Sequence, residues 1–186
     1  MQPEQAIRSV YPLSDEAWEL LNRHFVRTEL PKGHLLFKSG RTEQSVYFIE
    51  RGVARAYSLR DGREITFWIG MEGDPLISYN SYIHQKPGYE NIELLEPCVL
   101  LKIHSDTLQS LYRTRLDLAN WGRKLAEREL VKTEEHFISL QCKPAEERYR
   151  QILENRPELL QRVALMHIAA YLGVTQVTLS RIRAAR

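Results

Sequence analysis

Hydrogen-bonding side chains gather at the C-terminal end of this sequence, next to one apolar side chain, Val177. They are Thr175, Gln176, Thr178, Ser180, Arg181, Arg183 and Arg186. An arginine such as Arg181 can bond O6 and N7 of guanine, and a glutamine such as Gln176 can bond N6 and N7 of adenine. Val177 can touch a thymine methyl group, and Arg183 and Arg186 suit phosphate contacts. The pattern is typical of a surface that recognises DNA.

The residues around this set predict the elements that position it. Residues 163–172 have the apolar spacing of a helix, and Gly173 follows where a left-handed backbone would end that helix. Thr175 can cap a second helix, on which Leu179 and Ile182 share one buried face. We therefore predict a helix-turn-helix unit whose second helix offers its polar face to the major groove.

Charge is distributed in agreement with this prediction. The net charge is only +2, but residues 141–186 carry eight Lys and Arg against four Asp and Glu. This segment therefore has a charge of +4, and residues 1–140 have −2. A basic C-terminal segment favours an anionic partner such as duplex DNA.

Composition and motifs exclude other classes. The 186 residues are 43% hydrophobic and 27% charged, and no run approaches the roughly 18 apolar residues of a membrane span. With no signal-peptide pattern, we expect a cytoplasmic protein without membrane contact. Cys98 and Cys142 give neither a disulfide framework nor an iron–sulfur site. The histidines are scattered, so we expect no metal, no cofactor and no enzymatic activity.

The N-terminal two-thirds predicts a helix followed by strands. Residues 14–30 have a helical stripe of Trp18, Leu21, Phe25 and Val26, with Ser14 as N-cap. Short strand-like runs separated by glycines then extend to residue 104. Such spacing is typical of a small antiparallel sandwich or jelly roll.

One hairpin in this region can be predicted in register. Asp61-Gly62 fits a type I′ turn between two strands. A two-residue loop pairs Ser58 with Ile65, Ala56 with Phe67 and Ala54 with Ile69. On the opposite face Arg55 would meet Trp68 as a cation–π pair.

Residues 114–141 predict one long helix, which is preceded by a short helix from about residue 105. Apolar residues recur three and four apart along it as Leu116, Ala119, Ala126, Leu130, Phe137 and Leu140. This stripe is typical of a coiled-coil seam, and we favour a parallel homodimer over packing within one chain. A dimer would place two recognition helices about 34 Å apart and favour a palindromic site.

The order of these elements resembles the Crp/Fnr family of bacterial transcription regulators. LPKGHLLFKSG…YFIERGVARAY resembles the cyclic-nucleotide-binding β-roll, and IAAYLGVTQVTLSRIR resembles the family's helix-turn-helix signature. KPAEERY resembles a Bacteroidetes-type subgroup. The resemblance implies an α+β fold with a double-stranded β-helix (jelly roll) domain at 1–113, a dimerisation helix at 114–141 and a helix-turn-helix domain at 142–186. The wing that usually follows in the family is missing before the chain ends at Arg186, and truncation is one explanation.

The sequence departs from the family where cyclic AMP is bound. Ser78 and Tyr79 stand where a Glu-Leu pair is expected, and Gly88 and Tyr89 stand where Arg-Ser clamps the cyclic phosphate. We therefore expect no tight binding of cyclic AMP or cyclic GMP. The aromatic loop around these residues and Asn80 either lines an effector pocket or fills a ligand-free core, and we favour the second.

The predicted function is sequence-specific regulation of transcription. The expected partners are a palindromic DNA operator, a second copy of the chain, RNA polymerase and an unknown small-molecule effector. The alternative is a dimeric small-molecule sensor that has lost specific DNA binding and acts through protein partners.

Overall fold

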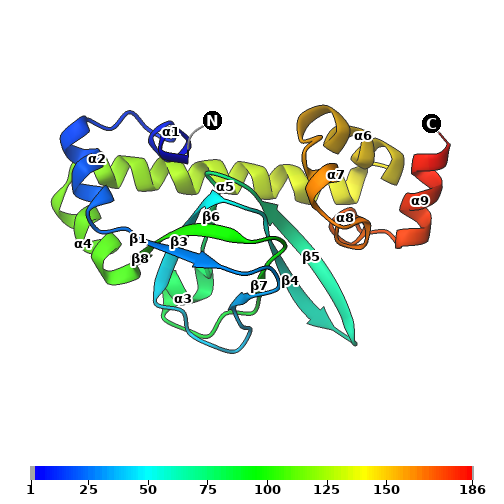
Figure 1. Cartoon of the computed structure of the whole chain (residues 1–186), viewed down its shortest axis with the longest axis horizontal. Helices are drawn as coiled ribbons and strands as arrows, with labels where there is room; N and C mark the ends of the chain where they lie inside the picture. Colours follow the sequence, from blue (N-terminus) through cyan, green and yellow to red (C-terminus); the bar gives the residue numbers. More distant parts are fainter. Residues whose placement is uncertain (1–2, 186) are drawn as a thin grey trace.

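Two antiparallel sheets form the centre of the molecule. The computed structural model describes residues 3–185. One sheet has the strand order β1-β8-β3-β6, and the other has the order β2-β7-β4-β5 (Figure 1). The strands are β1 Val26–Leu30, β2 Leu35–Phe37, β3 Ser45–Arg51, β4 Ala54–Arg60, β5 Arg63–Gly70, β6 Pro75–Leu76, β7 Asn91–Leu94 and β8 Cys98–His104. The predicted mixed α+β fold with an antiparallel β-sandwich is confirmed.

Helices gather at both ends of one long helix, α5, which runs over the sandwich and carries the C-terminal helices at its far end (Figure 1). Their bounds are α1 Pro3–Arg8, α2 Asp15–Asn22, α3 Tyr79–His84, α4 Ser105–Thr114, α5 Leu116–Cys142, α6 Ala145–Asn155, α7 Leu159–Arg162, α8 Leu165–Tyr171 and α9 Gln176–Ala184. The sequence patterns predicted α4, α5, α8 and α9 but missed α1, α3, α6 and α7. They also missed the strand β6.

The predicted helix over residues 14–30 is wrong in its second half. Ser14 is the N-cap, since its hydroxyl accepts a hydrogen bond from the Ala17 amide at 3.2 Å, but the helix ends at Asn22. Residues 26–30 form β1 instead, paired with β8 from Val26↔Lys102 to Leu30↔Cys98. The main-chain hydrogen bonds offered by β8 therefore outweigh a helical pattern that is weak beyond residue 22.

The hairpin register is correct at the turn and wrong beyond it. Asp61 and Gly62 have φ of 52° and 74°, as a type I′ turn requires, and Ser58 pairs with Ile65. A bulge between Ala56 and Tyr57 then shifts the pairing by one residue. Ala56 therefore pairs with Trp68 rather than Phe67, and Ala54 pairs with Gly70 rather than Ile69.

The shift also changes the partners of Arg55, so the predicted stacking on Trp68 is wrong. Arg55 is only 3% exposed and lies over the ring of Tyr57, with 4.1 Å between its Cζ and the ring centroid. Its guanidinium donates to Glu93 at 2.7 Å and to Thr66 at 3.2 Å, and it also pairs with Glu64. A buried arginine thus has its charge balanced by carboxylates on the two neighbouring strands.

The first half of α5 belongs to the core between the N-terminal helices and the first sheet. Trp121 is fully buried and packs against Phe48 of β3, and its indole N–H donates to the carbonyl of Ile7 at 2.8 Å. Gly122 follows because a Cβ there would lie 2.5 Å from the Tyr112 ring of α4. The only glycine of the predicted long helix therefore marks the close approach of α4 and α5.

A second core joins the other sheet to the C-terminal helices. It contains Val53, Ile69 and Leu95 from the sandwich together with buried residues of α6 to α9, which include Tyr149, Ile152, Leu159, Ile168, Leu172, Leu179 and Ile182. Because these side chains form one cluster, the helix-turn-helix is docked on the β-domain.

Candidate nucleic-acid interface and effector cavity

The helix-turn-helix is built as its sequence predicts. Helix α8 ends at Tyr171, Gly173 has a φ of +67°, and the Thr175 hydroxyl accepts a hydrogen bond from the Thr178 amide at 3.1 Å. Leu179 and Ile182 are buried against α8 and its neighbours. A left-handed glycine and a threonine cap therefore fix how α9 leaves the turn.

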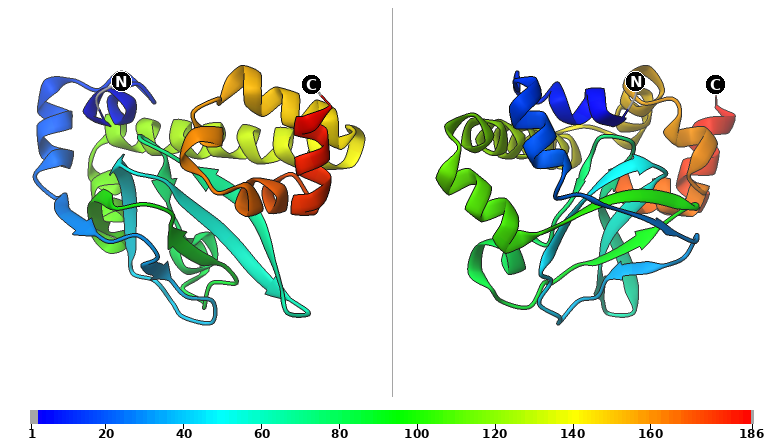
Figure 2. Two further views of the ribbon diagram at one scale, coloured as in Figure 1. Left: turned by 45° about the vertical axis from the view of Figure 1, so that its right-hand side comes forward. Right: turned by 60° about the vertical axis from the view of Figure 1, so that its left-hand side comes forward.

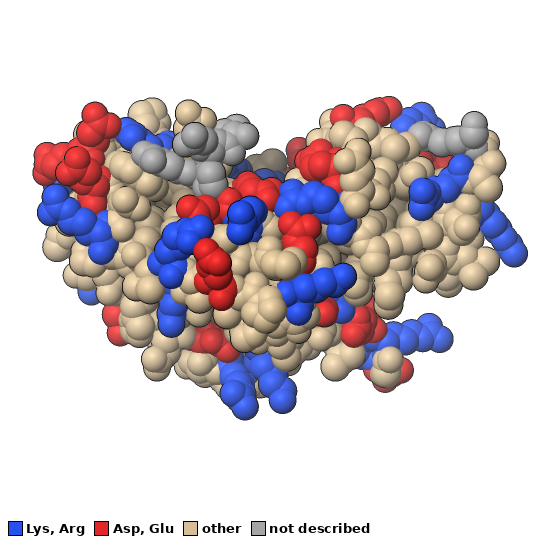
Figure 3. All heavy atoms as spheres, in the orientation of Figure 1, with Lys and Arg blue, Asp and Glu red and all other residues tan. Residues whose placement is uncertain are grey.

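The residues predicted to read DNA lie on the opposite side of α9. All of those within the described residues are exposed, namely Thr175, Gln176, Val177, Thr178, Ser180, Arg181 and Arg183. Arg186 lies outside the described residues. Figure 3 shows Lys and Arg at the edge of the molecule where Figure 1 places α9, whereas charges of both signs mix over the centre. The exposed face of α9 thus contains only basic charges among its described residues.

The β4–β5 hairpin lies beside the start of α9. One open groove of about 1000 Å³ lies between the hairpin and the helix-turn-helix. It is lined by Arg60, Asp61, Arg63, Glu64 and Ile65 on one side and by Ala170, Gly173, Val174, Thr175 and Thr178 on the other. Figure 2 shows the hairpin projecting from beneath α8. The hairpin end contains Arg60 and Arg63 but also Asp61 and Glu64, so the groove is not strongly basic.

Ion pairs fix the C-terminal helices to the sandwich. Arg162 of α7 donates to both carboxylate oxygens of Glu72, at 2.7 and 2.9 Å, and to Glu96. The Gly52 amide also donates to Glu72, at 2.9 Å. Burial by itself would raise the pKa of Glu72, but these hydrogen bonds outweigh it and lower the pKa to about 2. Glu72 is therefore ionised and bound to Arg162 at neutral pH.

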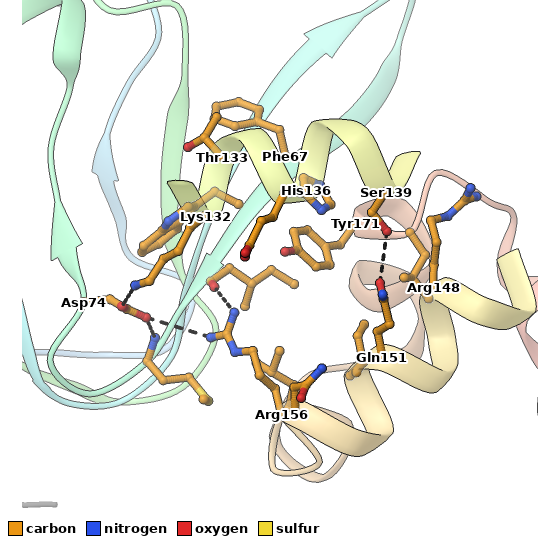
Figure 4. A pocket seen from close by; sticks show the side chains of 18 of the residues that line it. Phe67, Asp74, Lys132, Thr133, His136, Ser139, Arg148, Gln151, Arg156 and Tyr171 are labelled. Carbon is orange, nitrogen blue, oxygen red and sulfur yellow. Dashed lines mark hydrogen bonds and ion pairs between the residues drawn. The ribbon is translucent and has the colours of Figure 1, made fainter. Parts of the chain in front are cut away.

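A cavity of about 390 Å³ lies between α5, β5, α6 and α8 (Figure 4). His136 of α5 stacks on Tyr171 of α8 with ring centroids 4.1 Å apart, and Ser139 bonds to Gln151. Burial and the nearby Arg148 lower the pKa of His136, which is thus neutral at pH 7. The cavity walls come from both the sandwich and the helix-turn-helix segment, so a movement of one relative to the other would change the shape of the cavity.

The Arg162 ion pair gives a prediction for stability against pH. Because the pKa of Glu72 is lowered on folding, its stabilising effect is complete above about pH 4.5 and is lost as pH falls toward 2. We expect Arg162→Gln to lower the free energy of unfolding at pH 7. The difference in this free energy between variant and wild type, the stability gap, should narrow below pH 4.5. Urea unfolding at about pH 7 and pH 3 measures the gap. Arg150→Gln, at an exposed position of α6, is the control. An equal gap at both pH values contradicts the prediction.

The predicted dimer stripe is largely exposed on α5. Leu116, Leu130 and Phe137 are 78%, 69% and 62% exposed, and Ala126 is exposed as well. Ala119 and Leu140 are half-buried, and Leu140 lies beside Gly173 of the same chain. Leu118, Trp121 and Leu125 face the core instead. The helix therefore has one apolar face turned inward and a second turned to solvent.

A separate cavity of about 360 Å³ lies between the sandwich and α5. Tyr79 and Tyr89 of the predicted effector-pocket set line it. The other three, Ser78, Asn80 and Gly88, are not among its lining residues. The Ser78 hydroxyl bonds to Ser81, Asn80 donates to the Pro87 carbonyl, and the Gly88 amide bonds to the Arg41 carbonyl. These three residues shape the loop that carries the two tyrosines.

The cavity lining is aromatic and acidic. It includes Phe67, Trp68, Glu90 and Glu129, and it contains no Lys or Arg from residues 3–185. Glu90 and Glu129 are only 5% and 6% exposed. Burial, Glu129 and Tyr89 raise the pKa of Tyr79 to about 12, so its hydroxyl keeps its proton.

Glu90, Glu129 and Trp68 line the cavity but were not predicted from the sequence to do so. Glu90 directly follows Gly88 and Tyr89, so its place next to the predicted effector-pocket residues was readable from the sequence. Glu129 gave no such signal, because only the folded chain shows which side of α5 meets the cavity. Trp68 gave none either, because its position depends on the bulge in the hairpin.

Together these features define a β-sandwich domain joined through a long helix to a helix-turn-helix, an arrangement that supports a transcription regulator. Residues 27–115 match the family model described as "Cyclic nucleotide-binding domain". This part of the chain is thus similar to cyclic nucleotide-binding domains, and the chain's structural neighbours are regulators of the Crp/Fnr family, as the sequence resemblance predicted. The Bacteroidetes-type subgroup stays a prediction.

Known proteins with this arrangement include one related sequence and several solved structures. Electron transport regulator A of Shewanella oneidensis is 26% identical over 165 residues, which cover 82% of this chain and 65% of that protein. The chain thus spans less than two thirds of this curated relative. FixK2 from Bradyrhizobium japonicum has a TM-score of 0.74 at 21% identity, covering 87% of this chain and 83% of FixK2.

A second solved structure is the c-di-GMP responsive global regulator CLP of Xanthomonas campestris. It has a TM-score of 0.73 at 19% identity, covering 92% of this chain and 91% of CLP. CLP and the Shewanella oneidensis protein are each described as regulators. That this chain is not an enzyme stays a prediction.

No helix within residues 3–185 is long and apolar enough to cross a membrane. No group of three or more His, Cys, Asp or Glu in that range is placed to hold a metal ion.

Proposed function

We propose that this protein is a sequence-specific DNA-binding transcription regulator that acts as a homodimer. In this proposal α9 enters the major groove, two copies bind a palindromic operator, and a small molecule and RNA polymerase are its further partners. The domain limits 1–113, 114–141 and 142–186 assign sensing, dimerisation and DNA binding to successive parts of the chain.

The observation that carries this proposal is the two-sided character of α9. Its apolar residues Leu179 and Ile182 are buried, while its hydroxyl, amide and guanidinium groups are exposed. A helix held by one face and polar on the other is what groove recognition requires. The exposed stripe on α5 supports the dimer, since apolar side chains of that size favour a partner helix.

Selection of bound DNA from a random duplex library tests the proposal. We expect a palindromic consensus whose half-sites lie one helical turn apart, about 34 Å. Recovery of an asymmetric sequence would contradict the dimer, and recovery of no consensus would contradict specific binding.

Arg181→Ala is predicted to weaken binding to the selected operator by about 1–3 kcal/mol and to relax the preference at one base position. The reason is that its guanidinium can bond both acceptors of a guanine edge. Affinities for the operator and for each single-base variant of it, measured at one salt concentration, provide the test.

Arg183→Ala is the matched control, because Arg183 is another exposed arginine of the same helix. We assign it to a phosphate, so its loss should weaken binding equally on specific and random DNA and reduce the salt dependence by about one counterion. If Arg181→Ala behaves in this same uniform way, Arg181 is a phosphate contact and its assigned role is wrong.

A further inference from the structure

The cavity of about 360 Å³ between the sandwich and α5 has the size of a small-molecule site. Its walls come from β4, β5, the β6–α3 segment, the start of β7 and α5. The question is which chemical class of ligand these walls accept.

Two carboxylates, Glu90 and Glu129, line the cavity. Oε2 of Glu90 accepts from the Tyr89 amide at 3.1 Å, while Oε1 has no hydrogen-bond partner among residues 3–185. Glu129 is bound by Lys132 of its own helix at 2.9 Å and lies 3.5 Å from Nε of Arg128, so its charge is largely balanced. Burying a carboxylate oxygen without a partner costs free energy, so Glu90 favours a ligand that brings a donor or a positive charge.

Aromatic rings supply the remaining walls. Phe67, Tyr79 and Tyr89 are large side chains that remain 38%, 41% and 61% exposed, and all three line this cavity together with Trp68. The faces of such rings attract organic cations. The same negative charge opposes the phosphate of a cyclic nucleotide, for which the lining offers no arginine or lysine within the described chain.

We propose that this cavity binds a small organic cation, an ammonium group on an apolar or aromatic body, with Glu90 and Glu129 facing the charge and the aromatic rings enclosing the body. The role of this cation as effector rests on the proposed function; its binding does not.

The surroundings give a bound cation a connection to the C-terminal helices. Lys132 lies 2.9 Å from Glu129 and 2.7 Å from Asp74, and Asp74 lies 3.9 Å from Arg156 of α6 (Figure 4). A cation beside Glu129 competes with Lys132 and Arg128 for that carboxylate. Occupancy therefore changes the ion pairs that hold α6 against the sandwich.

Calorimetric titration of the full chain tests the ligand class with defined probes. Phenethylammonium and benzyltrimethylammonium are the cations, 2-phenylethanol is a neutral compound of similar size, and cyclic AMP is the anion. We expect both cations to bind at least about tenfold more tightly than 2-phenylethanol, and cyclic AMP to give no saturable binding. Equal binding of cation and neutral compound, tighter binding of cyclic AMP, or no binding of either cation at about 10 mM overturns the proposal.

Variants locate the binding in this cavity. Glu90→Gln keeps the side-chain size but removes the charge, and we expect about a tenfold loss of cation affinity with little change for 2-phenylethanol. Tyr89→Ala removes an exposed ring and should weaken both. Glu154→Gln, at an exposed position of α6, is the control and should change neither. Unchanged cation affinity in Glu90→Gln overturns the assignment.

The DNA selection described above is scored separately. Cation binding without a DNA consensus leaves the ligand proposal standing and removes the proposed function. A palindromic consensus without cation binding leaves the proposed function standing and removes the ligand proposal. If both succeed, we expect benzyltrimethylammonium to change operator affinity in the wild type and less so in Lys132→Met.

Discussion

Replacement of both Leu130 and Phe137 by glutamate is expected to make the protein monomeric and to lower its affinity for a two-half-site operator by at least about 100-fold. The two side chains lie two turns apart on one face of α5 and are 69% and 62% exposed. Charges introduced there would be desolvated in a helix–helix seam. Loss of the dimer also removes the effective concentration that lets the second α9 bind.

Sedimentation equilibrium measures the oligomeric state, and a mobility-shift titration measures operator affinity. Val131→Glu with Ile138→Glu is the matched control: these positions have the same spacing, are 51% and 48% exposed, and lie about 100° further around the helix. The control should stay dimeric. If the Leu130/Phe137 variant is still dimeric, or if the wild type is monomeric, the prediction that α5 forms the dimer interface is wrong.

Arg55→Met is expected to lower the free energy of unfolding by about 2–4 kcal/mol, the largest stability effect that we predict for one charged side chain. Arg55 is 3% exposed and holds Glu93 at 2.7 Å and Glu64 at 2.6 Å. Methionine fills much of the space but leaves two carboxylates close together without their cation. Urea unfolding at neutral pH gives the value.

A second variant separates lost charge pairing from lost packing. In Arg55→Met with Glu93→Met the less exposed carboxylate is removed as well, and we expect it to recover at least half of the loss. Arg60→Met, at an exposed end of the same strand, should change stability by less than about 0.5 kcal/mol. If the double variant loses as much free energy of unfolding as Arg55→Met and Glu93→Met lose in sum, packing rather than charge explains the effect.

The C-terminal helix pair was predictable because its determinants are local. Gly173 and Thr175 act through the conformation and hydrogen bonds of neighbouring residues, so their types alone locate the turn and the start of α9. The type I′ turn at Asp61-Gly62 was predictable for the same reason. The strand β1 was not predictable, because it depends on pairing with β8, which lies far along the chain. The bulge after Ala56 was not predictable either, because residue propensities do not reveal the extra residue in the hairpin.

By itself the sequence determined the succession of a β-rich region, a long helix and a terminal helix pair, the antiparallel character of the sandwich, the turn before α9 and the absence of the Arg-Ser pair at Gly88 and Tyr89. Only the tertiary structure decided the surroundings of Arg55, which face of α5 is buried, and the meeting of Glu90, Glu129 and Trp68 around one cavity. The physical reason is range. Turns and caps depend on a few adjacent residues, whereas burial and charge pairing depend on which distant surfaces exclude water together.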